Sequence, residues 1–453
     1  MRRPAATVAA LACGAVLLCS GCAGWGGGGA GGGGRSISVL MVNNPQMVDL
    51  QRLTADNFTK KTGIRVNFTV LPENDVRDKI SQEFSSQAGQ YDVATLSNFE
   101  IPIYARSRWV APLSDYIAKD SGFDQADVLK PMTQSLSGDD GKIYGEPFYG
   151  ESSFLMYRKD VLAAKGITMP DKPTWQQVAD IAAKVDGAQP RMRGICLRGQ
   201  PGWGQLFAPL TTVVNTFGGT WFTKDWQAQV DGEGFRAATQ FYVDLVRAHG
   251  EAGAPQAGFT ECLNNLVQGN VAIWYDATSA AGSLEAADSP VRGKIGYALA
   301  PVVKTSSSGW LYAWAWAIQR ASQHKDDAWA FISWASGKEY ERLVGSKLGW
   351  SKVPAGKRAS TYEIPQYVKE AAAFAAPTKA AIEGADPKNP GVQPRPAIGI
   401  QFVDIPEFPD LGTQVSQYVS AAIAGKLPVS DALARGQTLA DDVAERYRSR
   451  QSS

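Results

Sequence analysis

Residues 37–96 read ISVLMVNNPQMVDLQRLTADNFTKKTGIRVNFTVLPENDVRDKISQEFSSQAGQYDVATL, and this stretch decides the class of fold. Three apolar runs, at 37–42, 64–71 and 91–96, have the length and composition of buried strands. Between them, apolar residues recur every three or four positions, which predicts two amphipathic helices. Strands that alternate with helices through short connections predict an α/β fold with a parallel sheet. Ligands of such sheets bind beyond the carboxyl ends of the strands.

The same kind of pattern predicts a second α/β unit further along the chain. It begins after Glu151 with a strand at 154–157 and continues with strands at 271–276 and 295–300. The helix expected at 174–185 opens with the Thr-x-x-Gln pattern of a capping box, in which side chains bond the free backbone groups of the first turn. We therefore expect two α/β units in the chain.

The N-terminus has the features of an export signal followed by a lipid attachment site. An apolar segment at 5–18 follows two arginines and is too short to cross a bilayer. Small residues then lead to Cys22, in a pattern that resembles the lipobox of bacterial lipoproteins. We therefore expect residues 1–22 to be a lipoprotein signal peptide and Cys22 to carry the lipid. Cys19 is a second candidate, and an ordinary secreted protein is the alternative interpretation.

The residues after the signal predict a tether. Residues 23–35 are rich in glycine, so we expect a flexible linker, and no later apolar run is long enough to span a membrane. Of the five cysteines, Cys13 and Cys19 would leave with the signal peptide and one would carry lipid. Cys196 and Cys262 then remain, and an oxidising compartment permits a disulfide between them. Two separate buried thiols are the alternative.

Composition and motifs argue against several classes of function. The net charge of +1 does not suit a nucleic-acid-binding protein, and only two histidines, His249 and His324, occur. A carbohydrate-active hydrolase could use two acids from Glu146, Glu151 and Asp276, but only their carboxylate identity supports that alternative. Phosphate-loop, zinc-protease and nucleophile-elbow motifs are absent from the sequence. We expect no enzymatic activity, no cofactor and no metal.

Several segments, in this order, resemble the family 1 extracellular solute-binding proteins, the group that includes maltose-binding protein. They are FTKKTGIRVNFTVLP, QYDVATLSNFE, GEPFYGESSFLMYRKD, PTWQQVADIAAKV, QGNVAIWYDAT and DDAWAFISWASGKEYERLVGSKLGWSKVPA. Three further segments look most like the sorbitol- and mannitol-binding members: GICLRGQPGWGQLFAPLTTVVNTFGGTWF, GWLYAWAWAIQRAS and PAIGIQFVDIPEFPDLGTQV.

The resemblance implies a two-lobe, type II periplasmic-binding-protein-like fold whose hinge the chain crosses about three times. Residues 36–148 and 317–358 would form the N-terminal lobe, and residues 152–309 and 359–453 the C-terminal lobe. Ligand would bind in the interlobe cleft, and closure would bury it.

The implied function is that of the substrate-binding lipoprotein of an ABC importer, which binds a small linear polyol and delivers it to the permease. A mono- or disaccharide ligand in the same role is the alternative. The expected partners are the ligand and the permease subunits, with no nucleic acid. The protein would be a monomer, held at the extracytoplasmic face of the cell membrane by its lipid.

A polyol needs hydrogen-bond donors and acceptors for its hydroxyls and flat apolar surfaces for its C–H faces. The candidates are polar or tryptophan residues near strand ends, in the glycine-rich loop at 198–204 and in the crossover segments. Turn chemistry alone could explain the asparagines, and Glu151 could be a solvent-exposed hinge carboxylate. The expected ligand-binding residues are Asn43, Asn44, Gln46, Asn98, Glu100, Glu151, Arg198, Trp203, Trp274, Asp276 and Trp314.

Overall fold

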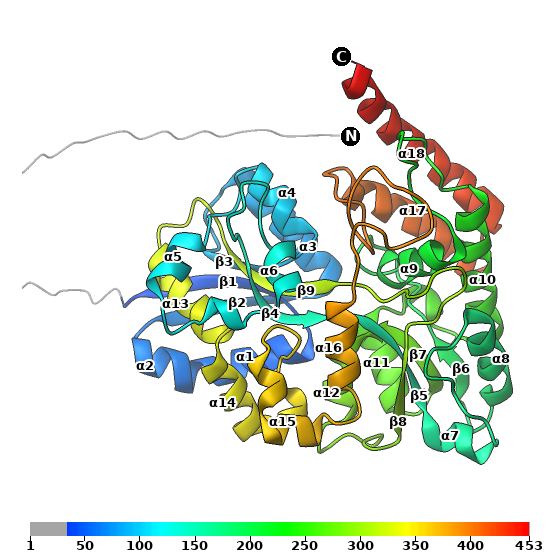
Figure 1. Cartoon of the computed structure of the whole chain (residues 1–453), viewed down its shortest axis with the longest axis horizontal. Helices are drawn as coiled ribbons and strands as arrows, with labels where there is room; N and C mark the ends of the chain where they lie inside the picture. The colour runs from blue at the N-terminus through cyan, green and yellow to red at the C-terminus, as the bar shows by residue number, and fades with distance from the viewer. Residues whose placement is uncertain (1–33, 453) are drawn as a thin grey trace, which may run out of the picture. The chain divides into compact units, whose positions relative to one another are not determined.

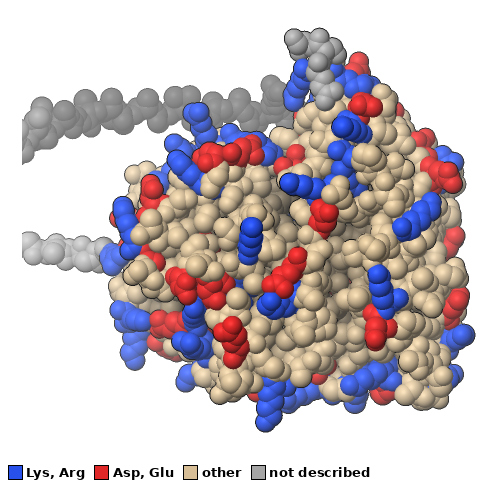
Figure 2. Space-filling view, in the orientation of Figure 1, with Lys and Arg blue, Asp and Glu red and all other residues tan. Residues whose placement is uncertain are grey.

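The computed structural model describes residues 34–452. The expected signal peptide at 1–22, the lipidation site Cys22 and nearly all of the expected linker at 23–35 lie outside the described residues. Within the described part of the chain, no helix is both long and apolar enough to cross a membrane. Acidic and basic side chains are interspersed over the face drawn in Figure 2, which shows no patch of a single sign.

The first sheet has five strands in the order β2-β1-β3-β9-β4. Strands β1 (Ser36–Val42), β2 (Arg65–Leu71) and β3 (Val93–Ser97) are parallel, as the pattern at 37–96 predicts. Strands β9 (Tyr312–Ile318) and β4 (Glu146–Glu151) complete it in antiparallel pairs. Strand β9 carries the alternating tryptophan run and is inserted between β3 and β4.

Helices lie on both sides of this sheet, with α3 and α4 on one side and α1, α2 and α14 on the other (Figure 1). Helix α1 (Pro45–Thr54) continues through a π-helical turn (Ala55–Thr59) into α2 (Lys60–Thr62), and Gly63 ends it with a φ of 74°. Such a left-handed cap suits glycine. The other helices of this part are α3 (Glu73–Ser86), α4 (Glu100–Arg106), α5 (Ser114–Lys119), α6 (Lys130–Ser135), α13 (Lys325–Ala335) and α14 (Lys338–Leu348).

The second sheet has four strands in the order β6-β7-β5-β8. They are β5 (Ser153–Arg158), β6 (Arg193–Cys196), β7 (Val271–Ala277) and β8 (Ile295–Leu299), and only the pair β6 and β7 is parallel. Helix α8 (Trp175–Val185) has the expected capping box at Thr174. The other helices of this part are α7 (Lys159–Ala164), α9 (Phe207–Phe217), α10 (Glu233–His249), α11 (Phe259–Val267), α12 (Ala281–Leu284), α17 (Phe408–Ile423) and α18 (Val429–Ser452).

The chain passes between the two sheets three times. The first passage is at Ser152, where β4 leads directly into β5, and the second is the segment 300–311 between β8 and β9. The third runs from 349 to 407 and includes α15 (Pro365–Glu370) and α16 (Ala375–Glu383). Its last part, 384–407, contains no helix or strand.

Strand β4 is clamped at the first passage by the start of the third. Gly150 N donates to Ala355 O at 3.1 Å, and a β-carbon at Gly150 would lie 2.1 Å from Gly356 O. The fully buried Lys357 donates to Phe148 O at 2.8 Å and pairs with Glu341 at 3.0 Å. Only glycine allows this approach of the two backbones, so the passages form one tightly joined hinge region.

Glu146, the first residue of β4, is completely buried. Burial raises the pKa of its carboxyl from 4.5 to about 8, although the Arg358 guanidinium acts in the opposite direction. Between these two pH values the folded protein keeps a proton that the unfolded chain releases. The stability associated with this proton is therefore fully present at acidic pH and is lost as the pH rises toward 8.

We predict that Glu146→Gln flattens the dependence of stability on pH. The free energy of unfolding of the wild type should fall between pH 5 and 8, and the variant should remove up to about 1.4 kcal/mol per pH unit of that slope. Urea denaturation at several pH values measures it. Glu363→Gln, at an exposed carboxylate, is the matched control. Equal slopes for the wild type and Glu146→Gln would contradict a proton on Glu146.

Candidate functional site

A pocket of about 340 Å³ lies between the two sheets, at the carboxyl ends of strands from both. This volume is near the lower end of the range of roughly 300–1,000 Å³ for small-molecule sites. Its lining includes Asn43, Asn44, Glu73, Asn74, Arg77, Tyr149, Glu151, Arg198, Phe259, Ser279, Tyr312, Trp314, Gln401 and Phe402. Of the expected ligand-binding residues, five line this pocket: Asn43, Asn44, Glu151, Arg198 and Trp314.

Asn44 has a double role at the end of β1. Its side-chain oxygen accepts from Met47 N at 3.1 Å and so caps helix α1, as turn chemistry alone would allow. Its amide nitrogen donates to Tyr149 Oη at 2.8 Å, and both residues line the pocket. The capping bond orients the amide toward the pocket, so the structural and the binding interpretations are compatible.

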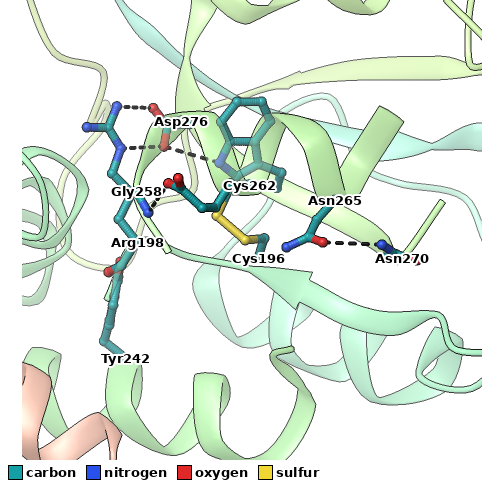
Figure 3. The surroundings of a disulfide bond; sticks show 10 residues. Cys196, Arg198, Tyr242, Gly258, Cys262, Asn265, Asn270 and Asp276 are labelled. Carbon is teal, nitrogen blue, oxygen red and sulfur yellow. Dashed lines mark hydrogen bonds and ion pairs between the residues drawn. A yellow bond between two sulfur atoms is a disulfide. The ribbon is translucent and has the colours of Figure 1, made fainter. Parts of the chain in front are cut away.

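Arg198 is held from behind by Asp276 (Figure 3). The guanidinium donates to both carboxylate oxygens, at 2.8 and 2.6 Å, and Asp276 is completely buried. Trp274 Nε1 donates to the same carboxylate at 3.1 Å. Neither Trp274 nor Asp276 lines the pocket. The structure thus places these two expected ligand residues in the layer that positions Arg198.

A disulfide joins Cys196 to Cys262 beside this group, with a Cα separation of 5.6 Å (Figure 3). It ties the end of β6 to helix α11. The sequence alone had left open whether these two cysteines form a disulfide or remain separate thiols. Arg198 follows one cysteine by two residues, and Phe259 precedes the other by three. Because both residues line the pocket, the disulfide fixes two of its walls against each other.

Arg77 is the corresponding cation from the first lobe, and it was not among the expected ligand-binding residues. It lines the pocket, pairs with Glu73 at 2.9 Å and with Glu100 at 3.2 Å, and its guanidinium carbon lies 4.2 Å from the Trp203 ring centroid. It also donates to Tyr312 Oη at 2.6 Å. Glu100 and Trp203, both expected at the ligand, thus surround Arg77 and do not line the pocket.

The last two expected residues, Asn98 and Gln46, make hydrogen bonds within the protein. Asn98 donates to Leu311 O at 3.2 Å and accepts from Ala313 N at 3.0 Å, and it lines a second cavity behind β9. Gln46 donates to Ser279 O at 3.1 Å, across the two lobes. These contacts fix the strand and the lobe arrangement, and neither residue lines the pocket.

Three of the lining residues that were not anticipated have a recognisable signal. Glu73 and Asn74 begin helix α3 just after the end of β2, and Arg77 lies one turn further along the same helix. The strand-end rule that selected Asn43 and Asn44 therefore also points to this segment. Gln401 and Phe402 have no such signal, because they come from a segment without periodic structure.

The charged groups of the pocket are largely neutralised by one another. Burial opposes the charge of Arg198, but Asp276, Glu73 and Glu151 together raise the arginine pKa. Burial also opposes the charge of Arg77, whose pKa is raised by Tyr312, Glu73 and Glu100 together. Both arginines therefore stay cationic, each beside its own carboxylate. This arrangement suits an uncharged ligand.

Glu151 differs from the other acids of the site. Burial raises its carboxyl pKa to about 8, while a hydrogen bond from Ser279 Oγ at 2.5 Å and the charge of Arg198 act in the opposite direction. At neutral pH this carboxyl keeps its proton, so it can donate one hydrogen bond and accept others.

Among the described residues no group of histidine, cysteine and acidic side chains could hold a metal ion.

Comparisons with known proteins agree with this geometry. Residues 44–342 match the family described as bacterial extracellular solute-binding protein. The chain is 38% identical over 405 residues to the mannitol-binding protein of Pseudomonas aeruginosa, which covers 89% of this chain and 91% of that protein.

Two solved structures are similar over nearly the whole described chain. An ABC transporter solute-binding protein from Agrobacterium vitis with bound D-mannitol has a TM-score of 0.88 at 41% identity and covers 91% of this chain and 99% of that one. A solute-binding protein from Agrobacterium radiobacter in complex with ribitol has a TM-score of 0.79 at 22% identity, covers 90% of this chain and 99% of that one, and shows a shared fold. The expected two-lobe fold is confirmed.

We predict that the disulfide contributes strongly to stability. Replacing Cys196 and Cys262 with alanine should lower the free energy of unfolding by about 4 kcal/mol in the chain-entropy model, because the bond closes a loop of 66 residues. Guanidinium denaturation measures the loss, and mass spectrometry of an unreduced digest shows whether the two peptides are linked. Two unlinked peptides from the untreated wild type would contradict the pairing.

Proposed function

This chain belongs to the family of bacterial extracellular solute-binding proteins, and we propose from that premise that it binds a short acyclic polyol of the mannitol or sorbitol type. Its role is that of the substrate-binding subunit of an ABC importer, outside the cytoplasm, and it is not an enzyme. The observation that carries the ligand proposal is the small pocket whose two arginines are already paired with carboxylates.

The chemistry of the lining supports an uncharged, hydroxyl-rich ligand. Hydrogen-bonding groups come from Asn43, Asn44, Glu151 and Arg198, and Trp314 offers a flat apolar surface. Both arginines remain cationic donors, and carboxylates already compensate their positive charge before any ligand arrives. An anionic ligand would have to compete with carboxylates that are already in place, whereas hydroxyls can share these groups. We propose these five residues as direct ligand contacts.

We propose that the remaining expected residues act indirectly. Asp276 and Trp274 support Arg198, Glu100 and Trp203 support Arg77, and Gln46 and Asn98 make contacts within the protein. The set is Gln46, Asn98, Glu100, Trp203, Trp274 and Asp276.

Contacts across the pocket support binding by closure of the lobes. Asn74 Nδ2 donates to Pro201 O at 2.9 Å, and Glu73 lies 4.0 Å from the guanidinium of Arg198. With the bond from Gln46, these contacts come from both lobes, as a closed state requires. In this proposal residues 36–148 and 317–358 form one lobe and residues 152–309 and 359–453 the other, as the resemblance implies, except that β4 (Glu146–Glu151) and β9 (Tyr312–Ile318) belong entirely to the sheet of the first lobe. The closed form delivers the ligand to the permease.

The proposed location is the outer face of the cell membrane. The Cys22 lipobox pattern and the glycine-rich segment behind it support a lipid anchor on a monomeric protein. Cys22→Ser should move the protein from the membrane fraction to the soluble fraction, because serine cannot carry the lipid that is proposed to hold the protein at the membrane. A variant that stays acylated and sediments with membranes would point to Cys19 or to another means of attachment.

The ligand proposal predicts a clear order of affinities. Isothermal titration should give tight binding of mannitol or sorbitol, weaker binding of the shorter ribitol, and no measurable binding of maltose or trehalose. Ribitol should bind more weakly because its missing hydroxyl leaves a buried protein group unpaired, at a cost of about 1–3 kcal/mol. The disaccharides should not bind because they are too large for a pocket of about 340 Å³. Tight binding of a disaccharide with no binding of any hexitol would contradict the polyol proposal and leave the transport role in place.

Glu151 allows a test of how the proton takes part in binding. Glu151→Gln should keep the affinity for the hexitol within about threefold at pH 7, because a neutral amide retains a donor and an acceptor. Glu151→Ala should weaken binding by about ten- to a hundredfold.

The same group predicts a dependence on pH. Since the pKa of Glu151 is raised to about 8, ionisation at pH 9 removes its donor and should weaken hexitol binding by the wild type. Titrations at pH 6.5 and pH 9 should show no such change for Glu151→Gln. An identical pH profile for the two proteins would mean that Glu151 does not carry the proton used in binding.

A further inference from the structure

A second cavity, of about 730 Å³, lies beside the ligand pocket. It is bounded by α4, α6 and the loop that follows α6 on one side, and by residues 383–404 on the other. Three residues line both spaces: Tyr312, Gln401 and Phe402. These three side chains therefore form a partition between the ligand pocket of about 340 Å³ and the larger second cavity.

Tyr312 belongs to β9, whereas Gln401 and Phe402 belong to residues 384–407, which connect α16 to α17 and pass between α4 and α17 (Figure 1). This segment is tied to both lobes. Asn215 Nδ2, from α9, donates to Ile400 O at 2.8 Å, and Arg106, from α4, pairs with Asp404 at 2.8 Å. Although it contains no helix or strand, the segment is thus held in place at the residues that flank Gln401 and Phe402.

Phe402 is the rigid part of this partition. Its ring centroid lies 4.9 Å from that of Trp203 and 5.3 Å from that of Phe99, and the side chain is buried. Gln401, its neighbour in the chain, is buried as well. Aromatic packing from both lobes holds Phe402 in position, so a ligand cannot displace it without breaking these contacts.

We propose that Gln401 and Phe402 determine the length of ligand that the protein accepts. This inference rests on the proposed function. Gln401 and Phe402 end the pocket after a single acyclic polyol unit and so exclude a ligand that is extended by a glycosyl group. The space behind them is lined by polar side chains such as Gln134, Asp139 and Lys388. Those groups can bond sugar hydroxyls, so the partition itself, and not the chemistry beyond it, sets the limit.

The test compares mannitol with maltitol, a hexitol that carries one additional glucosyl unit. In Phe402→Ala, the ratio of the two dissociation constants from isothermal titration should shift toward maltitol by at least about tenfold, equivalent to about 1.4 kcal/mol. Phe408→Ala is the matched control, because Phe408 belongs to the same aromatic cluster, is buried, and lines neither space. Its ratio should equal that of the wild type.

Milder variants keep the test decisive if Phe402→Ala does not fold. Gln401→Ala and Phe402→Leu should each shift the ratio in the same direction by a smaller factor. An unchanged ratio in folded variants that bind mannitol would overturn the partition, and so would an equal shift in Phe408→Ala. Wild-type protein that binds maltitol as well as mannitol would also overturn it, while the polyol function would stand.

Failure of the proposed function gives a different result. If the wild type binds sugars but no polyol, the polyol function is wrong, and the same variants are then compared with glucose and maltose. A shift toward maltose in Phe402→Ala, absent from Phe408→Ala, would still support the partition. An unchanged ratio would overturn it.

Discussion

A row of alternating charges crosses the ligand pocket, and the geometry of the site depends on it. Glu100 and Glu73 flank Arg77 in the first lobe, and Asp276 holds Arg198 in the second. Glu73 also lies 4.0 Å from Arg198 and so faces both arginines. A buried guanidinium without a carboxylate would be very costly, so each arginine needs its acidic partner. The row places donors in the pocket without giving it a large net charge.

The other features of the site extend this constraint. Aromatic rings cover the arginine of the first lobe, and a disulfide holds the loop of the second, so neither cation can turn toward solvent without losing packing. The groups that remain available in the pocket are amides, a protonated carboxyl and indole faces, which suit hydroxyls and C–H surfaces. Specificity for an uncharged polyol then follows from charges that are already satisfied and from a pocket that is closed on one side by residues 384–407.

The fold could be predicted from the sequence because strand and helix periods are local. The strand-end rule found Asn43 and Asn44, whereas Glu151 was expected from its place in a crossover segment and Arg198 from the glycine-rich loop. The sequence could not show that Arg198 lines the pocket while Asp276 lies behind it. Strand β7 is buried along its whole length, so both of its faces look alike in the sequence. Arg77 lies in α3, the helix that follows β2, and was not among the expected residues because it is six residues beyond the end of the strand. Phe402 could not be found this way, because its position depends on tertiary contacts of a segment without periodicity.

The most direct test of the account is a crystal structure of the protein with mannitol. The account predicts one mannitol molecule in the pocket between the lobes, with hydroxyls within hydrogen-bond distance of Arg198 and Glu151. The Arg198–Asp276 and Arg77–Glu73 pairs should remain intact, and Phe402 should stand at one end of the ligand. A mannitol molecule bound outside this pocket, or a pocket in which the ligand replaces Asp276 as the partner of Arg198, would contradict it.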